Sequence, residues 1–274
     1  MGSGPDAVTS NSTTSGVTTI LIDRPSRRNA VDLPTAEKLY EKVLDFEVNP
    51  SQKVCILAGA YGTFCAGADL HDVADIQQPP KSRKNLQPVQ GCNLAPMGPS
   101  RLQVKKPIIA AVSGYAVAGG LELSLVADIR IVEEDAVFGV FCRRWGVPLI
   151  DGGTVRLQAI VGLGRALDMI LTGRPVDAKE ALAMGLANRV VPKGKAIEEA
   201  TKLAKQLLTF PQLCMNKDRA SCYYSAYNAS SFEDAMRNEF ENGVEVLSVE
   251  SIKGATKFKN GEGRNGRFDA ASKL

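Results

Sequence analysis

The chain has 274 residues, of which 44% are hydrophobic and 23% are charged, and its formal net charge is +3. The composition is ordinary for a globular protein, and the length suffices for one large domain or for one domain with an appendage. The small net charge gives no reason to expect a nucleic-acid or membrane partner, and no apolar run is long enough to span a bilayer.

Cysteine and histidine usage restricts the chemistry further. The six cysteines are scattered and form no C-x-x-C pair. We therefore expect reduced thiols in a reducing compartment. His71 is the only histidine, so neither a histidine-based zinc site nor a Ser-His-Asp triad is expected.

The first half of the chain is dominated by apolar, β-branched runs that are typical of buried strands. In chain order these runs span residues 17–23, 53–60, 107–112, 129–132 and 136–141. A helix is predicted from Asp32, as its N-cap, to about Glu47. Residues 77–101 are rich in Pro, Gln, Lys and Gly, and we expect either a mobile flap or a loop that lines a substrate site.

The second half of the chain has the periodicity of amphipathic helices. The helical patterns span residues 152–161, 164–171, 177–184 and 196–208, and from 211 to about 249. Residues 1–16 are rich in small polar side chains and are predicted to be a disordered tail. We accordingly divide the chain into that tail, a core over 17–200 and a C-terminal helical region over 201–274.

The last three residues, Ser272-Lys273-Leu274, match a signal that a peroxisomal import receptor reads. We therefore expect the protein in the peroxisome, with that receptor as a partner.

The stretch 106–123 is the most informative. It begins as a buried strand, continues through small residues, and opens a helical pattern at Gly119-Gly120. Such a strand, glycine turn and helix start expose backbone N–H groups that suit an oxygen becoming negative during a reaction. Glu122, in the first helical turn, either serves that chemistry or only compensates the helix dipole.

Two segments in this order resemble the crotonase, or enoyl-CoA hydratase/isomerase, superfamily. They are Phe64-Cys-Ala-Gly-Ala-Asp-Leu70 and the stretch 106–123 with its Gly119-Gly120-Leu121-Glu122. The likeness continues through Phe138-Gly139, Asp151-Gly-Gly-Thr154, Leu171-Thr-Gly173 and Ala181-x-x-x-Gly185-Leu186. It implies an α/β fold in which repeated ββα turns form a spiral core, with C-terminal helices that assemble a homotrimer or a hexamer.

The resemblance also implies a reaction site. In this family two backbone N–H groups hold the thioester oxygen of an acyl-CoA while an enolate develops, and the motifs assign them to Ala68 and Gly119. Hydratases of the family use two glutamates; the first matches Glu122, but the second position holds Cys142. A thiol has a reference pKa near 8.5, so standard two-glutamate hydration is in doubt. Cys142 is either a reactive nucleophile or a small buried filler.

A third acid stands close to these positions in the sequence. Asp151 resembles the aspartate of dienoyl-CoA isomerases and aryl-CoA dehalogenases, where it carries a proton or acts as a nucleophile. The alternative is an N-cap for the helix at 152–161. Trp145, the only tryptophan, either lines the acyl pocket or is a packed aromatic residue.

The CoA moiety requires cations for its phosphates and a surface for adenine. The family resemblance places Arg27 and Arg28, followed by Ala30, in the CoA-contacting loop. Backbone at Ala66 and Asp69 would flank adenine, and Lys259 is a further candidate. Each of these cations could equally be a solvated surface charge.

These observations predict an enoyl-CoA hydratase/isomerase-type enzyme of fatty acyl-CoA metabolism. Glu122, with or without Asp151, would shuttle protons in a double-bond isomerisation or a variant hydration. The acyl-CoA thioester is the substrate, and no metal or redox cofactor is expected. The alternative is a degenerate member that binds acyl-CoA, or serves as a scaffold, without turnover.

Overall fold

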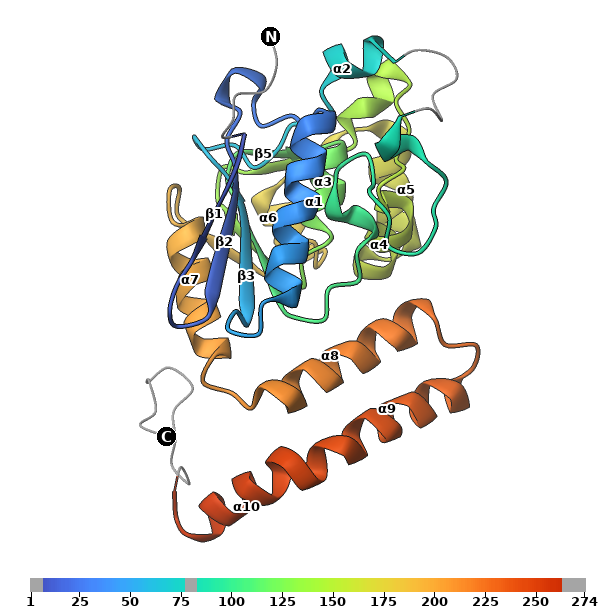
Figure 1. Ribbon diagram of the computed structural model, residues 1–274. Coiled ribbons are helices and arrows are strands. Elements are labelled where there is room, and N and C mark those ends of the chain that lie inside the picture. The colour runs from blue at the N-terminus through green and yellow to red at the C-terminus, as the bar shows by residue number, and fades with distance from the viewer. Residues whose placement is uncertain (1–6, 77–82, 263–274) are drawn as a thin grey trace. The chain divides into compact units, whose positions relative to one another are not determined.

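The computed structural model describes residues 7–76 and 83–262 (Figure 1). The chain divides into two compact units, residues 1–201 and 202–274. The described part of the first unit contains a six-stranded sheet of order β1-β2-β3-β4-β6-β9 and a three-stranded sheet of order β5-β7-β8. The larger sheet consists of β1 Val8–Ser12, β2 Val17–Ile22, β3 Val54–Gly59, β4 Ile108–Val112, β6 Ile129–Glu133 and β9 Arg189–Val191. The smaller sheet consists of β5 Tyr115–Val117, β7 Val137–Gly139 and β8 Pro175–Asp177.

The centre of the larger sheet is parallel and buried on both faces. From β2 to β9 every pairing is parallel, and all residues of β3 and β4 are buried. A parallel strand that is covered on both faces needs a continuous apolar run, because neither of its faces meets water. This is why the strand predictions at 53–60 and 107–112 are confirmed. The three-residue strands β5, β8 and β9 are too short for a pattern to identify them.

The N-terminal segment corrects one prediction. Residues 8–12, expected in a disordered tail over 1–16, form β1, which pairs antiparallel with β2. Ala7 and Val8 are buried, and a turn at residues 13–16 returns the chain to β2. The sheet edge thus orders a polar sequence, because the backbone hydrogen bonds of the ladder do not depend on large side chains.

The longer helices of the first unit follow the predicted pattern, whereas the short helix α2, Leu70–Ala74, was not predicted. The helices are α1 Leu33–Val48, α2 Leu70–Ala74, α3 Gly119–Ser124, α4 Gly153–Val161, α5 Leu163–Thr172, α6 Ala178–Ala183 and α7 Ala196–Leu207, which crosses the boundary between the units. Figure 1 shows α1 lying along the strands β1 to β3. α1 begins where the sequence predicts, since the Asp32 carboxylate accepts a hydrogen bond from the Thr35 N–H at 2.9 Å.

The segment 77–101, expected to be a flap or a lining loop, is partly described. It contains two short 3₁₀ helices, Lys84–Leu86 and Pro99–Arg101. The second contacts α1 and α3. This segment therefore passes beside the first turn of α3, which bears Glu122.

The second unit is helical. It contains α8 Gln212–Tyr227 and α9 Phe232–Val246, which pack on each other, and α10 Ile252–Lys259. The Glu250 carboxylate accepts hydrogen bonds from the Leu213 and Cys214 N–H groups at the start of α8. None of the described helices is long and apolar enough to cross a membrane. Ser272 to Leu274 lie outside the described residues, so the targeting signal stays a prediction.

Two helix caps give a test of this packing. The Asp32 carboxylate caps α1 and also pairs with the buried Arg24 guanidinium at 2.7 Å, whereas the exposed Asp177 carboxylate only caps α6. Asp177→Ala should lower the free energy of unfolding by about 1 kcal/mol, the usual loss of a cap. Asp32→Ala should lower it by about 3 kcal/mol, since a buried cation loses a partner. Urea unfolding measures both; equal losses would contradict this account of Arg24.

Candidate active site

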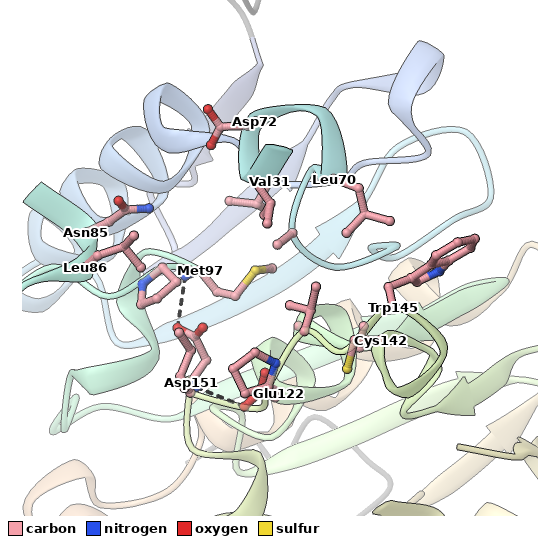
Figure 2. A pocket seen from close by; sticks show the side chains of 18 of the residues that line it. Val31, Leu70, Asp72, Asn85, Leu86, Met97, Glu122, Cys142, Trp145 and Asp151 are labelled. Carbon is pink, nitrogen blue, oxygen red and sulfur yellow. Dashed lines mark hydrogen bonds between the residues drawn. The ribbon is translucent and has the colours of Figure 1, made fainter. Parts of the chain in front are cut away.

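One cavity of the first unit collects all four predicted catalytic residues and one predicted CoA contact, Ala66 (Figure 2). Its volume is about 230 Å³, and its walls are largely apolar. Polar groups enter it at a few places. The lining comprises Val31, Ala66, Ala68, Leu70, Asp72, Val73, Ile76, Arg83, Asn85, Leu86, Pro96, Met97, Ala118, Gly119, Glu122, Phe141, Cys142, Trp145, Val147, Pro148, Ile150 and Asp151. Mostly apolar walls with few polar groups are typical of a small-molecule site.

The two loops that bear Ala68 and Gly119 meet in direct backbone contact. A Cβ atom at Gly67 would lie 3.0 Å from the Gly119 nitrogen, and one at Gly120 would lie 2.0 Å from the Cys65 carbonyl oxygen. The glycines of the two motifs are therefore needed for close approach, which any side chain would prevent.

Two backbone N–H groups are left unpaired where these loops meet. Among the described residues, neither the Ala68 nor the Gly119 nitrogen donates a hydrogen bond. Ala118, just before Gly119, has φ of 53°, a left-handed conformation that costs a non-glycine residue energy. Since both N–H-bearing residues line the cavity, the arrangement can hold a ligand oxygen that gains negative charge.

Glu122 is a buried carboxyl group held by backbone donors. Its side chain is on α3, its exposed fraction is 2%, and its Oε1 accepts hydrogen bonds from the Asp151 N–H at 2.9 Å and the Gly153 N–H at 2.8 Å. Burial, and next the nearby Asp151 carboxylate, raise the pKa of Glu122 to about 7, although the two N–H donors and Arg156 oppose the rise. A carboxyl group with such a pKa can both take up and release a proton at neutral pH.

Asp151 is not the N-cap of α4, which corrects one of the two alternatives. Gly152 occupies the cap position, and no side chain bonds there. The Asp151 carboxylate instead accepts hydrogen bonds from the Met97 N–H at 2.9 Å and from the Ser100 hydroxyl. Burial raises the pKa of Asp151, while these two donors lower it. The side chain thus joins the start of α4 to residues 97–100.

Cys142 and Trp145 lie on a short 3₁₀ helix, Phe141–Trp145, at the cavity wall. Burial, followed by the negative charge of Glu122, raises the pKa of the Cys142 thiol. A thiol kept protonated is a poor nucleophile, so the geometry favours the small buried filler. Trp145 is 69% exposed and lines the cavity, which favours the pocket-lining alternative over a packed aromatic.

The residues predicted to contact CoA are brought together in part. The turn at 24–30 is tied to the loop that bears Ala68, because the Ala66 N–H donates to the Arg28 carbonyl oxygen at 3.1 Å. Arg27 and Arg28 are exposed. The Asp69 carboxylate is buried and accepts a hydrogen bond from Arg24 at 3.2 Å.

The remaining predicted CoA contacts differ in their placement. Ala30 is buried, and its carbonyl oxygen accepts a hydrogen bond from the Arg24 guanidinium. Lys259 belongs to the second unit, at the end of α10.

Sequence reasoning missed several residues of the cavity. Met97 and Asn85 belong to the segment 77–101, which was expected to line a substrate site without any residue being singled out. Asp72 and Arg83 form an ion pair of 2.7 Å at the wall. No motif or period marks these positions. Among the described residues no cluster of histidine, cysteine and acidic side chains could hold a metal ion.

Known proteins resemble this chain in sequence and in fold. The sequence profile of the enoyl-CoA hydratase/isomerase family matches residues 12–263. An enoyl-CoA hydratase of Mycobacterium tuberculosis is 38% identical over 211 residues, 74% of each chain, and a carnitinyl-CoA dehydratase of Escherichia coli is 34% identical over 201 residues, 72% of each. A crystal structure of an M. tuberculosis enoyl-CoA hydratase superposes with a TM-score of 0.83 and 28% identity, covering 93% of this chain and 96% of the other. The predicted crotonase-like α/β fold is confirmed.

The raised pKa of Glu122 predicts a pH dependence of stability. The folded protein holds the Glu122 proton more tightly than the unfolded chain does. The stabilisation that this proton contributes is therefore full below about pH 4.5 and is lost as pH rises through about 7. Over that window the free energy of unfolding of the wild type should fall by up to about 3 kcal/mol more than that of Glu122→Gln. Urea unfolding at several pH values measures this, with Glu41→Gln, an exposed site on α1, as control. Parallel pH profiles for wild type and Glu122→Gln would contradict the assignment.

Proposed function

Because the chain belongs to the enoyl-CoA hydratase/isomerase family and is an enzyme of that type, we propose that Glu122 moves protons beside the thioester of a bound acyl-CoA. The observation that carries the proposal is a buried carboxyl group with a pKa near 7, on the same cavity as two unpaired backbone N–H groups. Proton transfer beside a thioester requires a base and a site for the resulting oxyanion.

The proposed step is an enolate mechanism. The free oxygen of Glu122 takes a proton from a carbon that is activated by the thioester, and the electron pair moves onto the thioester oxygen. The Ala68 and Gly119 N–H groups hold that oxygen as it becomes negative; losing one such donor typically costs about 3 kcal/mol in the barrier. Return of the same proton to another carbon moves the double bond with no net gain or loss of atoms.

Asp151 supports this step in the proposal by acting on Glu122. Its backbone N–H fixes Glu122 Oε1, and its carboxylate charge raises the pKa of Glu122. Its own carboxylate Oδ1 is engaged by Met97 and Ser100. These contacts favour a positioning role over direct proton transfer.

Because Cys142 stands where hydratases of the family have a second glutamate, the proposed reaction is a double-bond isomerisation or a variant hydration. A protonated thiol cannot deprotonate the water that a second carboxylate would activate. This substitution is also the one observation that favours the alternative, a member of the family that binds acyl-CoA without turnover. Such a binder has no need of Glu122 as a proton carrier, so the variant below distinguishes the two.

Assembly and location belong to the same proposal. The second unit exposes large apolar side chains along α9 and α10, among them Phe232, Phe240 and Ile252. These support a homotrimer, which could pair into a hexamer, and light scattering after size-exclusion chromatography measures the mass. Peroxisomal location, in fatty acyl-CoA metabolism, rests on Ser272-Lys273-Leu274, and imaging of a tagged chain with and without them tests it.

Glu122→Gln tests the proposed base directly. With 3-enoyl-CoA, the wild type should form the conjugated 2-enoyl-CoA, and Glu122→Gln should lower kcat by about 10²- to 10⁴-fold, because an amide cannot accept the proton. The absorbance of the conjugated thioester follows the reaction. Turnover unchanged in the variant would remove Glu122 from the mechanism, and Glu41→Gln serves as the matched control.

Cys142→Glu tests why standard hydration is not proposed. A second carboxylate at this wall position should increase the rate of water addition to a short trans-2-enoyl-CoA by about tenfold or more, since general-base catalysis contributes about 10²- to 10⁴-fold. Cys142→Ser, which adds no base, should leave hydration at the wild-type level. Mass analysis detects the added water. Strong hydration by the wild type, equal to that of Cys142→Glu, would show that another group activates water.

A further inference from the structure

Ser100 carries a buried hydroxyl group behind the wall of the cavity. Its exposed fraction is 2%, and it is not one of the residues that line the cavity. The hydroxyl donates a hydrogen bond to Oδ1 of Asp151, which does line the cavity. Because Ser100 itself does not line the cavity, any effect that it has on a bound ligand must pass through Asp151.

The backbone of Ser100 is fixed by a second link to the same segment. Ser100 is the middle residue of the 3₁₀ helix Pro99–Arg101, and its carbonyl oxygen accepts a hydrogen bond from the Arg156 guanidinium at 2.7 Å. Another nitrogen of Arg156 donates to the Asp151 carbonyl oxygen at 3.2 Å. The serine and the aspartate are thus joined twice, directly through their side chains and through Arg156 by their carbonyl oxygens.

The surroundings of the Asp151 side chain determine how readily it holds a negative charge. Burial raises the pKa of Asp151, and the Ser100 hydroxyl is the strongest of the groups that oppose this rise. The Met97 N–H, Arg101 and Arg156 follow it. Hydrogen-bond donors and cations act in this direction because they stabilise the charged form of a carboxyl group.

The charge of Asp151 acts in turn on Glu122. The Asp151 N–H bonds to Glu122 Oε1 at 2.9 Å, and the Asp151 carboxylate follows burial as a cause that raises the pKa of Glu122. Two buried carboxyl groups so close together do not readily ionise at the same time. The thiol of Cys142 is the other titratable group beside Glu122, and burial, followed by the charge of Glu122, raises its pKa and keeps it neutral.

We propose that Ser100 is a positioning residue of the proposed proton transfer: its hydroxyl keeps the Asp151 side chain an anion, so that the exchangeable proton of this acid pair resides on Glu122. The inference rests on the proposed function, since it takes Glu122 as the proton carrier. Without the hydroxyl, Asp151 takes up a proton more readily and its charge no longer acts on Glu122. Glu122 then becomes a weaker base and removes a proton from carbon less effectively.

Infrared difference spectroscopy of the ligand-free protein tests the proposal without turnover. The band of protonated carboxyl groups is followed against pH, and Glu122→Gln identifies the part that belongs to Glu122. In the wild type Glu122 should titrate near pH 7. In Ser100→Ala this titration should move down by about one pH unit, the size of effect that a lost neighbouring charge has. Ser100→Thr, which keeps a hydroxyl, should titrate as the wild type does.

A double variant shows whether the shift passes through Asp151. Asp151→Asn should lower the pH at which Glu122 titrates. Adding Ser100→Ala to Asp151→Asn should cause no further shift, because the charge that the serine maintains is already absent. Should Ser100→Ala fail to fold, Ser100→Cys, with a weaker donor of similar size, should shift the titration in the same direction by less.

Ser124→Ala is the matched control. Ser124 is also a buried serine, on α3, but its hydroxyl donates to the Leu121 carbonyl oxygen at 2.7 Å rather than to an acid. The titration of Glu122 should therefore be the same in Ser124→Ala as in the wild type.

The outcomes separate this inference from the proposed function. An equal Glu122 titration in wild type and Ser100→Ala, or a shift that persists in full beside Asp151→Asn, would overturn the inference. The acid limb of kcat/KM for 3-enoyl-CoA, which reports the base of the free enzyme, should move with the infrared titration. A shifted titration with an unchanged kcat/KM profile would uphold the effect of Ser100 on the acid pair and contradict Glu122 as the base, so that the proposed function would fail instead.

Discussion

The site depends on one interaction, the pair of hydrogen bonds that Glu122 Oε1 accepts from the backbone of Asp151 and Gly153. Burying a carboxylate without partners costs free energy. These donors offset part of that cost, and the group can still gain or lose a proton. Because burial, and next the nearby Asp151 carboxylate, act in the opposite direction, the pKa of Glu122 is raised to about 7. The same two hydrogen bonds attach the start of α4 to α3. They therefore position the proposed proton carrier and also stabilise the packing of these two helices.

A second constraint acts through backbone proximity around Gly119. Gly67 and Gly120 allow the two loops to touch, and the Met97 side chain lies against Gly119, where a Cβ atom would be 2.6 Å from Met97 Sδ. The Met97 N–H in turn bonds to the Asp151 carboxylate. A chain of contacts therefore runs from Glu122 through Asp151 and Met97 back to the proposed oxyanion donors. Asp151 thus positions residues 97–100, the start of α4 and the α3 turn relative to one another.

Sequence reasoning predicted much of this arrangement, and its omissions have physical causes. The fully buried strands and the cap at Asp32 follow from local patterns, whereas the pairing of the Ala68 and Gly119 loops follows from the family resemblance. By contrast, the partners of Asp151 lie 51 and 54 residues away along the chain, and its capping alternative fitted the local pattern equally well. Strand β1 owes its order to the sheet edge rather than to its own residues.

The central claim is that Glu122 carries protons to and from a carbon beside the thioester. It is tested most directly by incubating the protein with an acyl-CoA in heavy water and measuring deuterium uptake into the acyl group by mass spectrometry. The account predicts uptake at an exchangeable carbon with the wild type and a loss of that uptake in Glu122→Gln, with acyl-CoA binding retained. Uptake at the wild-type rate in Glu122→Gln, or none in a wild type that binds the acyl-CoA, would contradict it.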